Sequence, residues 1–242
     1  MDVHGKVAVV TGAGVRLGRA IALALGELGA RVVVHYNSSR GPADETVAAI
    51  VARGGQAFAV QGDLARAAEA GTIIEAGVAR YGQVDILVNS AAIFERATLL
   101  ETTEEHWDRH LSINLKAPFV LCQAYARQHP AGQRGHIINI ADWRATRPGT
   151  AYMAYTLAKA GLITLTQSLA LALGPDVQVN AIAPGAILPP PGDDGAYFRR
   201  LAERIPARRT GSPEEVVKAV RYLLASDFVT GELLLVTGGE HL

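Results

Sequence analysis

The stretch VAVVTGAGVRLG runs from Val7 to Gly18 and decides the fold. Four apolar residues lead directly into a glycine-rich turn, and a stretch with helical periodicity follows. Gly12 permits the tight turn, Gly14 lets a phosphate approach the backbone, and Gly18 lets the helix pack closely on the strand. The free N–H groups at the start of that helix suit a diphosphate, and the alternative is a glycine-rich turn without a ligand. The residues expected at this ligand are Thr11, Gly12, Gly14, Arg16, Leu17 and Gly18.

Outward from this stretch, β-branched apolar runs alternate with longer stretches of helical period. The expected strands cover residues 7–10, 32–35, 57–60, 86–89, 137–140, 177–181 and 233–236. The expected helices cover residues 17–29, 43–53, 65–81, 104–128, 152–173 and 214–225. The early strands are continuous apolar runs and not alternating ones, which is typical of strands covered on both faces by crossover helices. With 242 residues and 49% apolar side chains, we expect one α/β domain over residues 1–242, a single-domain Rossmann-type doubly wound parallel sheet of seven strands flanked by helices.

The charge pattern narrows the possible partners. The formal net charge is zero and no long run of like charges occurs, so neither a nucleic-acid footprint nor an anionic-membrane footprint is visible. The expected partner is a small molecule, with no nucleic acid and no membrane. No secretion signal precedes the first strand, so the expected location is cytoplasmic. We expect Cys122 to be a core side chain, and we expect no catalytic metal.

One segment departs from the alternation of strands and helices. Residues 187–195 contain three consecutive prolines and two glycines, and a short amphipathic stretch, 197–204, follows. Stiff prolines next to flexible glycines suit a loop that closes over a ligand. We therefore expect a substrate lid around residues 186–205, with an ordinary surface loop as the alternative.

The end of the second strand predicts which nucleotide binds. A cofactor without a 2′-phosphate is usually held by Asp or Glu at this point, and here no acid appears. The local groups are hydrogen-bond donors and the cations Arg16 and Arg40, which suit a 2′-phosphate, so we predict NADP(H). The alternative is that both arginines are only solvated surface cations. The cofactor contacts expected here are His35, Tyr36, Asn37 and Ser38.

Polar and small residues also follow the third and fourth strands. In an open α/β sheet, ligands bind beyond the carboxyl ends of the strands. Asp63 and Leu64 are therefore expected near the adenine, and Asn89, Ser90 and Ala91 near the nicotinamide ribose. The alternative is that the polar side chains are turn formers or helix caps.

A pair of residues in the fifth helix predicts the chemistry. Tyr155 and Lys159 are four residues apart and share one helical face, and a nearby cation favours phenolate and lowers the tyrosine pKa. Asp142 follows the fifth strand and Asn114 lies in the preceding helix, so all four polar groups are expected to converge. The alternatives are a solvated Tyr–Lys pair, a helix cap at Asp142 and a structural Asn114.

These motifs resemble the short-chain dehydrogenase/reductase family over essentially the whole chain. The resemblance rests on residues 11–18 and 89–92, on Asn114, on the Tyr155/Lys159 pair and on Pro184-Gly185. It implies hydride transfer from a nicotinamide, with Tyr155 as proton donor, Lys159 on the nicotinamide ribose and Asn114 on a water-linked proton path. It also implies a homotetramer. The resemblance adds Pro184, Gly185 and Ile187 to the expected cofactor contacts.

Two departures from the family pattern predict the substrate. Arg16 stands where most members have a glycine and Asp142 where they have a serine, and both resemble the pteridine reductases, as does Phe94. An ionised Asp142 would repel the oxygen anion of carbonyl reduction, whereas a nitrogen-rich pterin offers partners for a carboxyl group. We therefore expect NADPH-dependent reduction of dihydropteridines or dihydrofolate. The residues expected at the substrate are Arg16, Phe94, Asp142 and Tyr155.

Other readings remain open at this stage. The same apparatus could reduce another carbonyl or imine, or the protein could be a sensor that binds NADP without turnover. Phe94 could be an ordinary core residue, since aromatic side chains are often buried.

Overall fold

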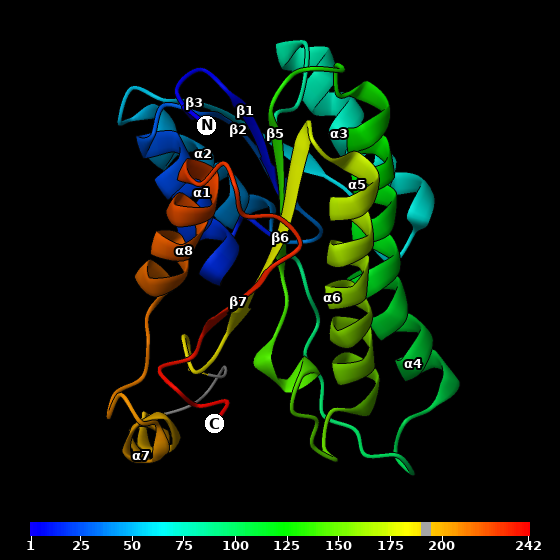
Figure 1. Cartoon of the computed structure of the whole chain (residues 1–242), viewed down its shortest axis with the longest axis vertical. Coiled ribbons are helices and arrows are strands. Elements are labelled where there is room, and N and C mark those ends of the chain that lie inside the picture. Colours follow the sequence, from blue (N-terminus) through cyan, green and yellow to red (C-terminus); the bar gives the residue numbers. More distant parts are fainter. Residues whose placement is uncertain (190–194) are drawn as a thin grey trace.

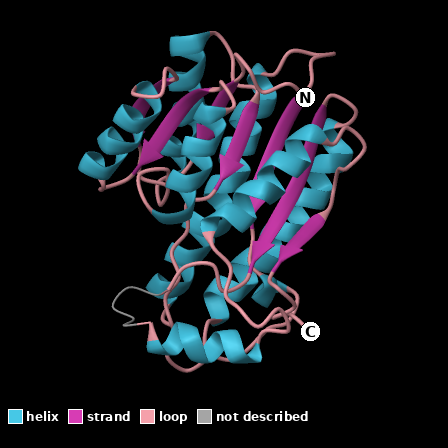
Figure 2. Ribbon diagram, turned by 90° about the vertical axis from the view of Figure 1, so that its left-hand side faces the viewer, coloured by secondary structure: helices cyan, strands magenta, loops and turns pink. Residues whose placement is uncertain are grey.

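A single seven-stranded sheet forms the centre of the protein. The computed structural model describes residues 1–189 and 195–242. All strand pairs are parallel and the order is β3-β2-β1-β4-β5-β6-β7, so the strand arrows point toward one end of the molecule (Figure 2). The strands are β1 Val7–Val10, β2 Arg31–Tyr36, β3 Gln56–Gln61, β4 Ile86–Asn89, β5 Gly135–Ile140, β6 Val177–Pro184 and β7 Leu233–Val236. The predicted single-domain, doubly wound α/β fold is confirmed.

Helices cover both faces of the sheet, with α1, α2 and α8 on one side and α3, α5 and α6 on the other (Figure 1). The helices are α1 Arg16–Glu27, α2 Arg40–Val51, α3 Ala67–Tyr81, α4 Glu104–Leu111, α5 Ala117–Gln128, α6 Met153–Leu173, α7 Ala196–Arg204 and α8 Pro213–Ala225. A short π-helical segment, η1 Ser112–Lys116, joins α4 to α5, and a 3₁₀ turn, η2 Trp143–Ala145, follows β5.

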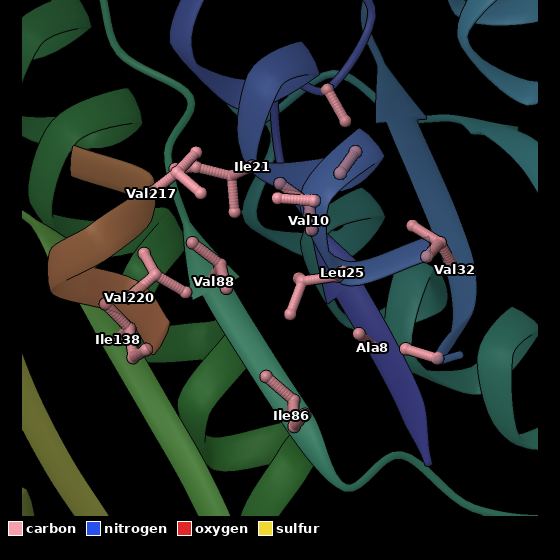
Figure 3. Packing of buried hydrophobic residues seen from close by; sticks show 14 of the residues in the cluster. Ala8, Val10, Ile21, Leu25, Val32, Ile86, Val88, Ile138, Val217 and Val220 are labelled. Atoms are coloured by element: carbon pink, nitrogen blue, oxygen red, sulfur yellow. The ribbon is translucent and has the colours of Figure 1, made fainter. Parts of the chain in front are cut away.

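Alternating side chains of each strand build two cores. Ala8 and Val10 of β1 pack beneath α1 and α8, where Ile21 contributes to the same cluster (Figure 3). Val7 and Val9 point to the opposite face and join the cluster beneath α3 and α5. Because both faces are buried, an alternating polar pattern is absent from β1, as the sequence indicates.

The long helix expected over residues 104–128 is corrected by the structure. The chain stays helical, but residues 112–116 form a π turn in which the Ala117 N–H donates to the Ser112 carbonyl. Pro118 has no N–H, so it cannot donate to the carbonyl of Asn114 as an α-helix requires. A π turn of this kind is often found at a functional site, and here it contains Asn114.

The predicted lid over residues 186–205 is described only in part. Residues 190–194, which include two of the three prolines and Gly192, lie outside the described residues. The amphipathic stretch that follows is helical as α7.

The length and apolar composition of helix α6 bear on the expectation of no membrane partner. Among the described residues, it alone is long and apolar enough to cross a membrane by length and composition. That expectation was too strict for this helix, although the core helix of a soluble protein passes the same test. The contacts of α6 with β6 and the burial of Tyr155, Ala158 and Lys159 account for its apolar character.

The close approach of α1 to the glycine turn gives a first prediction. A Cβ atom at Gly18 would overlap the Gly12 carbonyl oxygen and lie 2.8 Å from its carbonyl carbon. We expect Gly18→Ala to lower the free energy of unfolding by about 2 kcal/mol or more, because the obstacle is backbone. Gly71→Ala in α3 is the control, since nothing lies within 4 Å of its Cβ position, and it should stabilise by about 0.5–1 kcal/mol. Urea denaturation measures both, and equal effects would contradict this account of Gly18.

Candidate functional site

The carboxyl ends of three neighbouring strands meet at the point where the strand order reverses. Val10 of β1 pairs with Val88 of β4, and Asn89 of β4 pairs with Asn139 of β5. The chain segments that leave these strands therefore begin side by side. This is the crevice in which open α/β sheets bind ligands.

Thr11 holds two of these segments together. Its buried Oγ1 accepts hydrogen bonds from the backbone N–H groups of Ser90 and Ala91, at 2.9 and 3.0 Å. A Cβ atom on Gly12 would lie 3.0 Å from the Ala91 Cα, so the turn after β1 also touches the segment after β4. The predicted cofactor residue Thr11 thus has a structural role through its hydroxyl, and its contact with a cofactor stays a prediction.

The glycine turn leaves the start of α1 open. No side chain caps this helix N-terminus, so its first N–H groups are available to an anion. Gly14 is buried, and Leu17 and Gly18 lie in the first turn of α1. The turn therefore has a shape that fits a diphosphate group. At position 18 only glycine allows α1 to lie this close to the turn, because an added Cβ would clash with the Gly12 carbonyl.

Arg16 adopts a left-handed backbone conformation with φ of 52°. This conformation is uncommon for a residue with a side chain. The exposed guanidinium Nη2 donates to the Pro189 carbonyl at 3.0 Å. Arg16 thus links the glycine turn to the segment that follows β6.

His35 supports the same turn from the end of β2. The buried ring accepts a hydrogen bond from the Gly12 N–H at Nδ1, at 3.2 Å, and its Nε2 lies 3.0 Å from the Gly62 carbonyl. These partners require the neutral tautomer with the proton on Nε2. Burial also lowers the pKa of His35. The ring therefore positions the glycine turn, and a direct cofactor contact through it stays a prediction that this geometry does not favour.

Beyond His35 the end of β2 is open. Tyr36 is half-buried, whereas Asn37 and Ser38 are exposed. Arg40, an alternative partner for a phosphate, lies 3.6 Å from the Asp44 carboxylate. Arg16 is therefore the better candidate for a bound 2′-phosphate, because Arg40 already has a local anion.

The residues after β3 act mainly on their own turn. The Asp63 carboxylate accepts a hydrogen bond from the Ala65 N–H at 3.0 Å and lies 3.7 Å from Arg66. Leu64 is buried in the core beneath α3. The Asp63 side chain thus acts as a turn former. The place of Asp63 beside an adenine stays a prediction.

Asn89 points into the protein. Its Nδ2 donates to Asn139 Oδ1 at 2.8 Å, and Asn139 in turn donates to the Thr166 hydroxyl at 2.9 Å. The Asn89 side chain is buried and forms part of a polar link between β4, β5 and α6. Any contact with a ribose at this position must therefore come from the backbone or from Ser90 and Ala91.

The segment after β6 packs against the end of the chain. Pro184 ends the strand, and the Gly185 N–H donates to the Val236 carbonyl at 2.9 Å. Glu240 accepts a hydrogen bond from the Ala186 N–H at 2.8 Å, and Ile187 is buried. Sequence analysis did not single out Glu240, because it is far from every motif along the chain.

Asp142 and Tyr155 form the centre of the site. The Tyr155 hydroxyl donates to Asp142 Oδ2 at 2.9 Å. Asp142 Oδ1 accepts from the Arg144 N–H at 2.8 Å, so the carboxylate also caps η2. The Asp142 carboxylate thus has both predicted roles: Oδ1 caps η2, and Oδ2 accepts the hydrogen bond from Tyr155.

Lys159 lies one helical turn beyond Tyr155. Its buried Nζ donates to the Ile140 carbonyl at 2.6 Å and lies 5.8 Å from the centre of the Tyr155 ring. Burial lowers the pKa of Lys159 to about 8, although the Asp142 carboxylate opposes this shift. The ammonium is therefore held between the end of β5 and the phenol.

The expected net lowering of the Tyr155 pKa is not found, because other groups outweigh the Lys159 ammonium. Burial and the negative charge of Asp142 raise the pKa of Tyr155 well above its ordinary value, and Arg144 only partly opposes them. The phenol is therefore held in its protonated form. The proton is therefore present on the phenol, although the raised pKa makes it a weaker acid than an ordinary tyrosine.

Asn114 makes two hydrogen bonds to one residue. Its Oδ1 accepts from the Ile93 N–H and its Nδ2 donates to the Ile93 carbonyl, each at 3.0 Å. The Asn114 side chain therefore has a structural role, as the alternative stated, because it ties η1 to the segment after β4. The Asn114 carbonyl lacks its α-helical donor because residue 118 is proline, and a role of Asn114 on a water-linked proton path stays a prediction.

Phe94 lies at the surface of the site. It is 49% exposed, so the core-packing alternative is wrong. Its ring stacks on Tyr152 with centroids 4.3 Å apart and meets Tyr155 edge-on at 4.7 Å. The Arg144 guanidinium lies 5.6 Å from the Phe94 centroid. Sequence analysis missed Tyr152 and Arg144, although each is within three residues of a predicted site residue.

The chain is similar to known proteins in sequence and in overall fold. Residues 12–241 match the family model described as Enoyl-(Acyl carrier protein) reductase. An uncharacterized oxidoreductase of Methylorubrum extorquens is 38% identical, with 98% of each chain covered. A 3-oxoacyl-[acyl-carrier-protein] reductase of Synechocystis is 36% identical, with 97% of this chain and 96% of that protein covered. The crystal structure of FolM alternative dihydrofolate reductase 1 from Brucella canis, complexed with NADP, aligns with a TM-score of 0.94 at 32% identity, covering 99% of this chain and 95% of that one.

The buried Lys159 gives a prediction about pH. Because its pKa is lowered from 10.5 to about 8, the folded state releases a proton over this interval that the unfolded state retains. The free energy of unfolding should therefore rise with pH from about 8 upward. Lys159→Met lacks this group, so the wild type should gain about 2 kcal/mol relative to the variant between pH 7 and pH 9.5. Urea denaturation at both pH values measures the difference, and parallel pH curves would contradict the assignment.

Proposed function

We propose that the substrate of this protein is a pteridine of the dihydropteridine or dihydrofolate type. The chain belongs to the short-chain dehydrogenase/reductase family. The chain is an NADP-dependent oxidoreductase of that family. The observation that carries the narrower proposal is the hydrogen bond between Tyr155 and Asp142 beside the exposed ring of Phe94. The similarity to the FolM structure, which its description calls an alternative dihydrofolate reductase, supports the same substrate class.

The residues around the glycine turn fit the cofactor. The uncapped start of α1 would hold the diphosphate, and the cation of Arg16 with the exposed Asn37 and Ser38 would hold the 2′-phosphate. Lys159, Ser90, Ala91 and the segment from Pro184 to Ile187 would surround the ribose and the nicotinamide. When bound, NADPH supplies the hydride that reduces a carbon–nitrogen double bond, and it leaves as NADP⁺.

The proton comes from this chain's own side chains. Tyr155 is protonated because its pKa is raised, and its hydroxyl already points at the Asp142 carboxylate. In the proposed reaction a hydride adds to the ring carbon while the Tyr155 proton moves to the neighbouring nitrogen, so that the double bond becomes a CH–NH group. The resulting phenolate is stabilised by the Lys159 ammonium and regains its proton from solvent.

Asp142 has a second use toward a pterin. A carboxylate accepts hydrogen bonds, and the amino group and ring N–H of a pteridine are donors. A ketone offers no such donor, and its developing oxyanion would be repelled by the same charge. Phe94 provides the flat apolar surface that a heterocycle stacks on, and Arg144 lies beside both residues.

A second candidate function is reduction of a carbonyl compound. The 36% identical relative named as a 3-oxoacyl-[acyl-carrier-protein] reductase favours it. In this case Asp142 would have to be protonated or turned away from the reacting oxygen. The third alternative, an NADP sensor without turnover, leaves the combination of Tyr155, Asp142 and Lys159 without a purpose.

Assembly as a homotetramer in the cytoplasm is part of the same proposal. Exposed apolar side chains lie on α5 and α6, the two helices we expect at subunit contacts. They are Phe119, Leu157 and Leu171.

Replacement of the carboxylate tests the substrate. We expect the wild type to oxidise NADPH with dihydrobiopterin or dihydrofolate, and Asp142→Ser to lower kcat with these substrates by about 100-fold. The same variant should not lose activity toward ketones, because serine can donate to a developing oxyanion. Loss of NADPH absorbance with each substrate measures both effects.

Tyr155→Phe is the matched control for this experiment. It removes the proton donor and should lower activity toward every substrate. A wild type that reduces only ketones would reject the pteridine proposal, and an unchanged Tyr155→Phe variant would reject the catalytic role of the phenol.

The role of Arg16 is tested by cofactor preference. We expect kcat/KM to be about 100-fold higher with NADPH than with NADH, and Arg16→Gly to reduce that ratio by about tenfold through loss of a charge-assisted contact. Glycine accepts the left-handed backbone of this position, so the variant adds no strain. Arg134→Gln, at an exposed arginine paired with Asp227, should leave the ratio unchanged. A wild-type preference for NADH would overturn the assignment.

A further inference from the structure

A cluster of two histidines and a glutamate lies outside the site described above. His106 and His110 are one turn apart in α4, and Glu95 follows Phe94 in the segment after β4. The ligand atoms of these three side chains all lie within 4.8 Å of one another. A His-x-x-x-His pair on one helix is a known metal-binding arrangement. Our expectation of no catalytic metal assumed that the sequence contains no such pair, and that assumption is wrong, because His106 and His110 form one.

Three of the four histidine ring nitrogens in this cluster lack a hydrogen-bond partner among the described residues. His110 is fully buried and its Nδ1 lies 2.9 Å from the His106 carbonyl, which requires the proton on Nδ1 and leaves a lone pair on Nε2. That Nε2 is buried and has no hydrogen-bond partner among the described residues. The same holds for both ring nitrogens of His106, which are also buried. Unsatisfied buried nitrogens are costly, so these three atoms require an explanation.

The backbone contact of His110 has the form that metal sites use. A ligating histidine usually donates its second N–H to a carbonyl or carboxylate, which fixes the tautomer and aims the free nitrogen at the ion. Burial also lowers the pKa of His110, which favours the neutral ring that a metal needs. The rings of His106 and His110 lie with centroids 4.3 Å apart, so both present nitrogens to the same space.

The spacing is close to what one ion requires. Zinc binds histidine nitrogen and carboxylate oxygen at about 2.0–2.2 Å, so two ligands of one ion are at most about 4.4 Å apart. Glu95 Oε2 lies 3.8 Å from His106 Nε2, and rotation of side chains can bring the remaining atoms closer. The Glu95 side chain is 40% exposed, which leaves an entry path and room for a water as fourth ligand.

One cation already competes for the carboxylate. The Arg109 guanidinium forms an ion pair with Glu95 Oε2. This side chain is about half exposed, so it can turn into solvent when an ion takes its place.

From these observations we propose that Glu95, His106 and His110 bind a divalent transition-metal cation of the zinc class. The three side chains supply two nitrogens and one oxygen, and water completes a four-coordinate site. This site is separate from the proposed reduction and does not depend on it.

The experiment uses the full chain, stripped with a chelator and titrated at neutral pH. Cobalt(II) is followed by visible absorption and zinc by calorimetry. We expect a single equivalent of each ion to bind. His106→Gln should weaken binding by about 100-fold and Glu95→Gln by about tenfold, because each removes a ligand. Arg109→Gln should tighten it, because it removes the competing cation.

His4→Gln is the control, because it removes an exposed imidazole elsewhere and should leave the affinity unchanged. His110→Gln is not needed for the decision, since its burial could cause unfolding. Absence of a cobalt spectrum in the wild type, or binding to His106→Gln and Glu95→Gln as tight as to His4→Gln, would overturn the proposal. Loss of cobalt binding in Arg109→Gln would also overturn it, because the cluster would then be only an ion-pair network.

Discussion

Parallel pairing of β1, β4 and β5 is the constraint on which the rest of the molecule depends. Strands that run in one direction deliver their carboxyl ends to one edge, and their hydrogen-bonded register keeps those ends adjacent. The glycine turn, the Thr11 hydroxyl and the Asp142 carboxylate reach one crevice for this reason. Helix α6 then adds Tyr155 from the covering layer. No local segment could assemble this group without the sheet.

Much of the fold could be predicted from the sequence because burial leaves a direct trace in it. Strands that are covered on both faces are continuous apolar runs, as residues 7–10 and 86–88 are. The π turn was missed because residues 104–128 were treated as one regular helix, so the shift of the apolar face after the extra residue was not looked for. Pro118 was the visible sign, because it removes one donor from a helix that otherwise continues.

The sequence predicted where the site residues lie better than it predicted which way their side chains point. The chain order places His35 and Asn89 at strand ends and Asn114 in the helical stretch after β4, but their side chains turn into the protein and hold neighbouring segments. Sequence spacing carries no information on that choice. The protonation state of Tyr155 could not be predicted from sequence spacing either, because its pKa depends on how burial and the Asp142 charge weigh against the opposing Arg144 cation. Phe94 and Asp142, by contrast, lie beside Tyr155 as expected.

The π turn at η1 also limits how this chain can change in length. The π turn contains one residue more than an α-helical turn, which rotates the helix beyond it by about 100°. This rotation turns Leu121, Cys122 and Tyr125 toward the sheet. Deleting a single residue between α4 and α5 would restore a regular helix and bring polar side chains to the core. Length variation among relatives should therefore gather in surface loops, and the middle of this helix should tolerate none.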